Sequence, residues 1–246
     1  MKKIFYKTRN LFLGGKKLKV LAVVNHYYGE GNEFGGKSTY QNEEVRKEII
    51  QKVISSLSEI PRTDIKVCGI KKNSLFEIDQ DFSHLENPSF LIYETIEWMF
   101  SQIDKYDYFI NIEDDILLDR ETFERILEFD RKNLVNECFH PNRMEYKDGR
   151  EYCVDLKAMP GWTQMSKKYA NYDLRVALNP HSGISVLSKD KILYAKKYVD
   201  FKKRDKIIGH YMASAYANLH SPFMMFRPFP NLSSHKVIHL DNWEPK

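Results

Sequence analysis

The chain has 246 residues, of which 42% are hydrophobic and 29% are charged, a composition typical of a globular protein. This length allows one large domain or two small ones with a buried core. Because the formal net charge is only +4, we expect no nucleic-acid partner.

The cysteines and the apolar runs bear on the cellular compartment. Cys68, Cys138 and Cys153 are an odd number and form no C-x-x-C pair, so reduced thiols in a cytosol are the simplest interpretation. No run reaches the roughly 18 consecutive apolar residues of a membrane-spanning helix. We therefore expect a cytoplasmic protein.

Residues 1–18 form a basic leader that mixes Lys and Arg with short apolar runs and lacks the apolar region of a signal peptide. Two interpretations are open. The leader is either a frayed segment before the first strand or a basic amphipathic segment in peripheral contact with the inner face of an anionic membrane. We expect residues 19–246 to form a single domain.

Strand and helix patterns alternate over the first half of the chain. A continuous apolar run at 19–28 predicts a central parallel strand, and residues 45–57 continue with helical spacing, with Arg46 on the polar face. Further elements are predicted in this order: a strand at 64–70, a helix capped by Ser89, a strand at 106–112 and a helix capped by Asp119. This alternation predicts an α/β fold with an open, mostly parallel sheet and helices on both faces.

The second half of the chain has a different character. Residues 137–162 are aromatic and rich in turn formers, which predicts antiparallel strands and loops. Helices are predicted at 189–199 and at about 205–219. The proline-containing segment 223–246 is expected to be irregular.

The loop after the first predicted strand contains a phosphate-binding pattern. From Gly31 to Ser38 it fits G-x-x-x-x-G-K-[ST]. In a P-loop NTPase or kinase the backbone would cradle a β-phosphate, Lys37 would reach the γ-phosphate and Ser38 would hold Mg²⁺. The pattern has four free positions and is often met by chance, so its context must decide.

Three acids follow the strand predicted at 106–112, namely Glu113, Asp114 and Asp115. In an open α/β sheet, ligands bind beyond the carboxyl ends of the strands. Adjacent acids at such a place repel one another unless a cation or a hydrogen-bond network compensates them. A divalent ion that bridges them to substrate phosphates is one solution, and an exposed acidic helix start is the other.

Four segments, in order along the chain, resemble motifs of GT-A-fold glycosyltransferases. Residues 106–129 resemble the D-x-D region, with E-D-D in its place, and NPHSG at 179–183 resembles the acceptor-side segment. Asp205 stands where many of these enzymes place an acid at a helix start. PNLSSH, ending at His235, resembles the terminal P-x-L-x-x-H segment, whose histidine completes a metal site in several of these families.

The resemblance implies a GT-A-like (Rossmann-like) open mixed sheet, with a nucleotide-binding half at about 19–130 and an acceptor-binding half at about 131–246. It also implies a metal-dependent glycosyltransferase of the hexosyltransferase type. Such an enzyme passes a sugar from a nucleotide-diphosphate sugar to a glycan or lipid-linked acceptor, here in bacterial surface polysaccharide synthesis. A P-loop enzyme and a non-catalytic glycan-binding relative remain as alternatives.

The same resemblance assigns a metal site. We expect Mn²⁺ or Mg²⁺ on Asp115, with Glu113 as a further ligand or as the acid beside the ribose. Either His235 or His239 would supply a third ligand, and His235 is favoured through its motif.

The remaining site residues fall into three groups. The nucleotide would contact residues at the end of the first strand, two basic residues and the acids: Asn25, His26, Tyr27, Arg46, Lys71, Glu113 and Asp114. Asp205 and Asp155 are the candidates for a general base. The acceptor would contact Trp162, His181, Ser182 and Gly183, where glycine permits close approach of the backbone.

Overall fold

The computed structural model describes residues 12–13, 16–29, 42–153, 161–179 and 181–241. Most of the predicted basic leader lies outside these residues, as do the phosphate-binding pattern with Lys37 and Ser38 and the candidate base Asp155. Within the leader, β1 (Phe12–Leu13) and β2 (Lys16–Lys17) pair in an antiparallel ladder.

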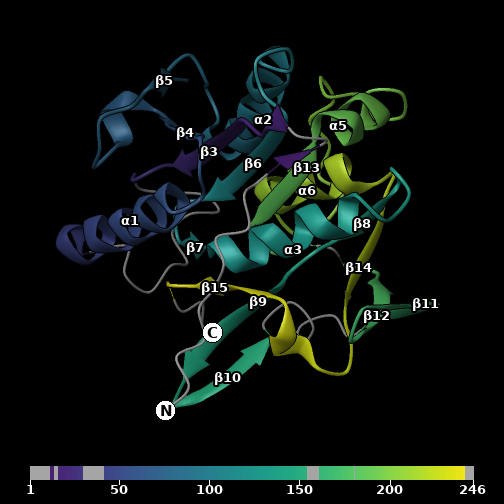
Figure 1. Cartoon of the computed structure of the whole chain (residues 1–246). Coiled ribbons are helices and arrows are strands. Elements are labelled where there is room, and N and C mark those ends of the chain that lie inside the picture. The colour runs from purple at the N-terminus through teal and green to yellow at the C-terminus, as the bar shows by residue number, and fades with distance from the viewer. Residues whose placement is uncertain (1–11, 14–15, 30–41, 154–160, 180, 242–246) are drawn as a thin grey trace.

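A five-stranded sheet forms the centre of the molecule, with the strand order β13-β6-β3-β4-β5 (Figure 1). Its strands are, in chain order, β3 (Val20–His26), β4 (Thr63–Gly69), β5 (Gln80–Asp81), β6 (Tyr108–Glu113) and β13 (Ile184–Ser188). All neighbouring pairs are parallel except β13 with β6, which is antiparallel. The sheet is thus mixed and mostly parallel, as predicted.

The order of the strands creates a switch point. From β3 the chain passes through α1 (Glu43–Ser58) to β4 and β5 on one side. It then returns through α2 (Leu91–Ser101) to β6 on the other side of β3. In open α/β sheets the crevice at the carboxyl ends of two such strands is the usual place for a ligand.

Helices cover both faces of this sheet, which confirms the predicted fold class. On one face α1 and α3 (Arg120–Asp130) pack their apolar residues against β3, β6 and β13. On the other face α2, α5 (Lys189–Ala195) and α6 (Tyr211–His220) form a second core. None of the helices in the described part of the chain combines the length and the apolar character needed to cross a bilayer.

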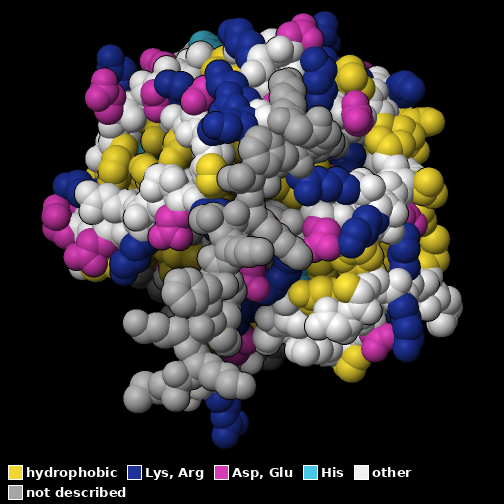
Figure 2. All heavy atoms as spheres, viewed as in Figure 1, with side chains coloured by type: hydrophobic (Ala, Val, Ile, Leu, Met, Phe, Trp, Pro, Cys, Tyr) yellow, Lys and Arg dark blue, Asp and Glu magenta, His cyan; other side chains and the backbone are white. Residues whose placement is uncertain are grey.

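Two smaller sheets, β10-β9-β15-β7 and β11-β12-β14-β8, are built mainly from the second half of the chain. Their strands are β7 (Ile116–Leu117), β8 (Glu137–Phe139), β9 (Asn142–Lys147), β10 (Arg150–Cys153), β11 (Trp162–Tyr169), β12 (Tyr172–Ala177), β14 (Met224–Pro228) and β15 (Lys236–His239). Short 3₁₀ turns occur at Lys71–Asn73, Pro88–Phe90 and Leu232–Ser234. On the face shown in Figure 2, acidic and basic side chains are interspersed.

Three local predictions need correction. The segment 223–246 is not irregular where it is described, because β14 and β15 find partners far back in the sequence and Pro228 stands at the end of its strand. The helix predicted from Asp205 begins only at Tyr211. Ser89 does not cap α2, since the side chain of Asn87 accepts from the Ser89 N–H and a 3₁₀ turn precedes the helix. The cap by Asp119 is confirmed, because its side chain accepts from the Thr122 N–H.

Gly183 joins the second half of the chain to the central sheet. Its φ is +68°, and a Cβ atom there would lie 2.7 Å from Cγ1 of Ile116 and 3.1 Å from Oε2 of Glu113. Its carbonyl accepts from the Glu113 N–H at 2.9 Å. Only glycine therefore allows β13 to begin this close to the acids at the end of β6.

We expect Gly183→Ala to lower the free energy of unfolding by about 2–4 kcal/mol, since it adds a steric clash to the cost of a left-handed backbone. Gly149→Ala is the matched control, because Gly149 has a φ of +70° and a Cβ added there would have no atom within 4 Å. It should lose only about 1 kcal/mol. Urea unfolding of both variants measures the difference, and equal losses would contradict the predicted clash.

Candidate functional site

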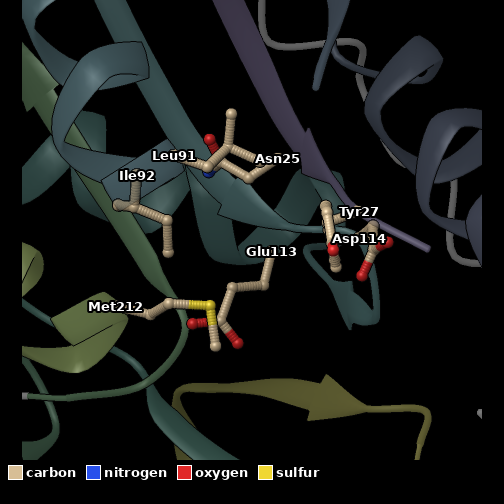
Figure 3. A pocket seen from close by; sticks show the side chains of 7 residues that line it. All are labelled: Asn25, Tyr27, Leu91, Ile92, Glu113, Asp114 and Met212. Atoms are coloured by element: carbon tan, nitrogen blue, oxygen red, sulfur yellow. The ribbon is translucent and has the colours of Figure 1, made fainter. Parts of the chain in front are cut away.

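A pocket lies at the switch point between β3 and β6. Four elements line it: the end of β3, the end of β6, and the first turns of α2 and α6. The lining residues are Asn25, Tyr27, Leu91, Ile92, Glu113, Asp114 and Met212. Figure 3 shows the side chains of Glu113 and Met212 together at one end of the pocket and those of Tyr27 and Asp114 at the other.

A buried polar network fixes the floor of this pocket. The Nδ2 group of Asn25 donates to Oδ1 of Asn111 at 2.8 Å, and its Oδ1 accepts from the hydroxyl of Thr95. The hydroxyl of Tyr216 donates to the same Asn111 oxygen at 3.0 Å. The polar groups of Asn25 are therefore engaged inside the protein, where buried polar groups need such partners, although sequence analysis assigned this residue to the nucleotide.

His26 contacts the acid loop, which is formed by residues 113–115 at the end of β6. Its ring is fully buried, its Nε2 accepts from the Leu75 N–H at 2.9 Å, and its Nδ1 lies 2.7 Å from Oδ2 of Asp114. Since Nε2 is an acceptor, the proton sits on Nδ1 and is donated to Asp114. Of the three residues predicted to meet the nucleotide from this strand end, Asn25 and Tyr27 line the pocket and His26 does not.

Arg46 stands at the centre of an ion cluster. Its side chain is buried, so its predicted place on the polar face of α1 is wrong. Nη2 contacts Oδ1 of Asp114, and Nη1 lies 3.4 Å from Oδ2 of Asp115 and 3.2 Å from Oδ2 of Asp241. Burial alone lowers the pKa of Arg46, but the charges of the three carboxylates raise it above its usual value. The guanidinium is thus charged and directed at acids rather than at a phosphate.

Asp115 contacts His239 in addition to Arg46. The two side chains are 3.6 Å apart, and the other ring nitrogen of His239 is bonded to Glu145. β15 pairs with β7 so that His239 lies opposite Ile116, the residue after Asp115. Burial lowers the pKa of His239, but Asp115 and Glu145 outweigh this effect and raise it. Asp115 itself is fully buried.

His235 is separate from this cluster, which corrects its assignment as the favoured metal ligand. Its ring stacks on Phe139 with 3.7 Å between the centroids, and Nε2 lies 3.3 Å from the Phe139 carbonyl oxygen. The backbone from His235 to His239 is extended, and four extended residues advance by about 13 Å. One ion at Asp115 is therefore not held by both histidines.

The side chains present do not fit the divalent ion predicted on Asp115. The oxygens of Asp114 contact Arg46 and His26, and Oδ2 of Asp115 contacts Arg46 and His239. Among the residues that the structure describes, no group of three His, Cys, Asp or Glu side chains is arranged to hold a metal ion. Glu113 is the member of the acid triplet whose carboxylate is turned into the pocket with Met212.

The predicted acceptor segment meets the pocket at Glu113. Gly183 adjoins its carboxylate, as described above, and the hydroxyl of Ser182 lies 2.6 Å from Nε2 of the buried His140. The carbonyl of His181 accepts from Arg227 at 2.8 Å, and burial lowers the pKa of His181 well below its ordinary value. The structure thus brings residues 181–183 next to the E-D-D loop through Gly183, while the predicted roles of both segments stay predictions.

Three of the remaining predicted site residues, Asp205, Lys71 and Trp162, are not among the residues that line the pocket. Asp205 is half exposed and forms an ion pair with Lys203 at 2.5 Å. Lys71 is exposed, with its backbone N–H bonded to Asp81 and Ser83. Trp162 packs against Phe229 with 4.8 Å between the ring centroids.

The site also contains residues that no sequence pattern indicated. Leu91, Ile92 and Met212 carry no polar group, and only the fold places them together. Asp241 joins the ion cluster through the pairing of β15 with β7, which no local pattern foretells.

Comparison with known proteins gives only distant likenesses. No family model and no curated protein matches the sequence. One similar solved structure is a glycosyltransferase involved in the glycosylation of the major capsid of PBCV-1, with 10% identity, 90% of this chain and 81% of that chain covered, and a TM-score of 0.38. Another is a putative nucleotide-diphospho-sugar transferase from Desulfovibrio desulfuricans G20, with 10% identity, 82% and 76% coverage and a TM-score of 0.40.

The environment of His235 predicts a loss of stability in acid. Burial lowers its pKa to about 3, whereas the unfolded chain titrates near 6.5. Between these values the unfolded state binds the proton and the folded state does not, so stability falls as the pH falls. From pH 7 to pH 5 this one group should cost about 2 kcal/mol.

We expect His235→Phe to lose about 2 kcal/mol less than the native chain between pH 7 and pH 5, whatever its stability at pH 7. Urea unfolding at the two pH values measures this difference. The same substitution at His84, which is exposed, controls for loss of an imidazole. If the native chain and His235→Phe lose the same free energy of unfolding between pH 7 and pH 5, the acid sensitivity does not come from His235.

Proposed function

We propose that this chain is a glycosyltransferase that takes a sugar from a nucleotide-diphosphate sugar and passes it to a glycan or glycolipid acceptor. One observation carries the proposal. The E-D-D loop ends β6 at the switch point of the sheet, and the NPHSG segment meets it there through Gly183. The two motifs that resemble the donor and acceptor sides of this enzyme class therefore meet at Glu113, which lines the pocket.

The pocket suits the diphosphate of such a donor. Leu91 and Ile92 belong to the first turn of α2, and Met212 belongs to the first turn of α6. The N–H of Leu91 is already bonded to the Pro88 carbonyl of the preceding 3₁₀ turn, whereas the first turn of a helix such as α6 presents unpaired N–H groups and the positive end of the helix dipole, which favour anions. The start of α6 at the pocket therefore offsets part of the negative charge of the acid loop.

The other lining residues suit the uncharged parts of a nucleotide sugar. Tyr27 lines the pocket, and an aromatic side chain can stack on a base. A carboxylate such as that of Glu113 is a pure acceptor when it is ionised, and it then suits the hydroxyl groups of a ribose or a transferred sugar. We therefore propose Glu113, rather than Asp205, as the carboxylate that contacts the reacting sugars.

The finer parts of the sequence-based prediction stay predictions. They are the hexosyltransferase type, a role in bacterial surface polysaccharide synthesis, and contact of residues 1–18 with the inner face of a membrane. The proposed function includes no metal ion on Asp114 or Asp115, because these acids contact Arg46, His26 and His239.

A thermal-shift panel of UDP, GDP, CMP and ATP tests the proposal. We expect a nucleoside diphosphate at 100 times its dissociation constant to stabilise the chain by about 2.7 kcal/mol, or several degrees in Tm. Glu113→Gln should reduce the shift given by the matching nucleotide sugar, since the amide is a poorer acceptor. The control Glu121→Gln alters an exposed ion pair with Arg125 and should leave the shift unchanged.

The alternatives give different results in the same panel. A P-loop enzyme predicts a shift with ATP that is lost in Lys37→Ala, whereas the proposed transferase keeps its nucleoside-diphosphate shift in that variant. A non-catalytic glycan-binding relative predicts no release of nucleoside diphosphate from a nucleotide sugar in the presence of acceptor. No shift with any nucleoside diphosphate would refute the proposal.

A further inference from the structure

We infer that the buried guanidinium of Arg46 takes the place of a divalent cation at the acid loop, so that this chain binds a nucleoside diphosphate without a metal ion on Asp114 or Asp115. The inference rests on the proposed function for the identity of the ligand. Its geometric part, which concerns the acids and Arg46 alone, does not depend on that function.

The acids of this loop are compensated from within the chain. Nη2 of Arg46 contacts Asp114, while Nη1 lies 3.4 Å from Asp115 and 3.2 Å from Asp241. The relative exposure of the Arg46 side chain is only 2%, and those of the three carboxylates are between 0% and 3%. Repulsion among three buried carboxylates is the problem that a divalent ion solves at such a loop, and here a cation already lies among them.

Arginine suits this position because of its shape. The guanidinium has five N–H donors in a planar fork and stays charged in proteins. It can therefore bond several carboxylates at once, as the contacts of Nη1 and Nη2 illustrate. Lysine, with one compact ammonium group, does not have this geometry.

A divalent ion on Oδ2 of Asp115 would have to displace Arg46. The guanidinium would then be left buried away from these carboxylates, and an uncompensated buried charge is strongly unfavourable. Two other contacts also hold the acids in place: His26 at 2.7 Å from Asp114, and His239 at 3.6 Å from Asp115. Each acid of the pair thus has two protein partners of its own.

The first experiment uses the native chain. Titration with Mn²⁺ alone, followed by the electron paramagnetic resonance signal of free Mn²⁺, should show no binding at concentrations up to the millimolar range. Calorimetric titration with UDP and with GDP should give affinities that agree within threefold in EDTA and in Mn²⁺. Mn²⁺ binding that is lost in Asp115→Asn would overturn the inference, as would a more than tenfold loss of nucleotide affinity in EDTA.

The second experiment removes the arginine. Arg46→Met leaves Asp114, Asp115 and Asp241 without their shared cation, and we expect Mn²⁺ to raise the Tm of this variant but not that of the native chain. The matched control is Arg120→Met, which removes a partly buried ion pair with Glu124 away from the acid loop and should show no Mn²⁺ effect. If Arg46→Met does not fold without Mn²⁺ but folds with it, the inference is supported. If Mn²⁺ has no effect on the variant, the proposed exchange of arginine for a cation is refuted.

The two levels of proposal fail in different ways. If neither UDP nor GDP binds under any condition, the proposed function fails, while the Mn²⁺ titrations still decide the role of Arg46. If a nucleoside diphosphate binds only with Mn²⁺, the proposed function stands and the inference about Arg46 falls.

Discussion

The ion cluster around Arg46 joins parts of the chain that the central sheet does not connect. The guanidinium comes from α1, and Asp114 and Asp115 lie in the turn after β6. Asp241 lies two residues beyond the end of β15. Buried ion pairs often add little net stability, but breaking one is costly because a charge is left without compensation. The cluster therefore fixes where these three segments lie relative to one another, and the acid loop takes its shape from it.

The pocket depends on a second set of buried contacts that involves the same elements as its lining. Thr95 of α2, Asn25 of β3, Asn111 of β6 and Tyr216 of α6 share one hydrogen-bonded network. Each of these four elements also contributes to the wall of the pocket or to its rim. A fully satisfied network of this kind permits only one arrangement of the groups that take part. The relative positions of Tyr27, Glu113 and Met212 are thus set before any ligand arrives.

Sequence patterns predicted the parts of this fold that depend on local information. The apolar runs correspond to β3, β4 and β6, because burial on both faces of a parallel sheet leaves a continuous apolar signature. The helical stripe at 45–57 corresponds to α1. β14 and β15 were missed because their partners lie up to about a hundred residues back. The choice between His235 and His239 likewise depended on which residue pairs with Ile116, and register between distant strands is not written in a short motif.

The role of Arg46 shows where closer attention to periodicity would have helped. The buried residues of α1 are Arg46, Ile49, Ile50, Val53 and Leu57, so the arginine begins the apolar stripe rather than facing away from it. An arginine in a buried stripe needs acidic partners, and the acids at 113–115 needed a cation. The carboxylates that compensate Arg46 lie 68, 69 and 195 residues further along the chain. Neither the arginine nor the acids alone therefore indicate which residue is the partner. An acid triplet after a buried strand therefore predicts a compensating cation but not its kind, and a search for buried arginines elsewhere in the sequence should precede the assignment of a metal.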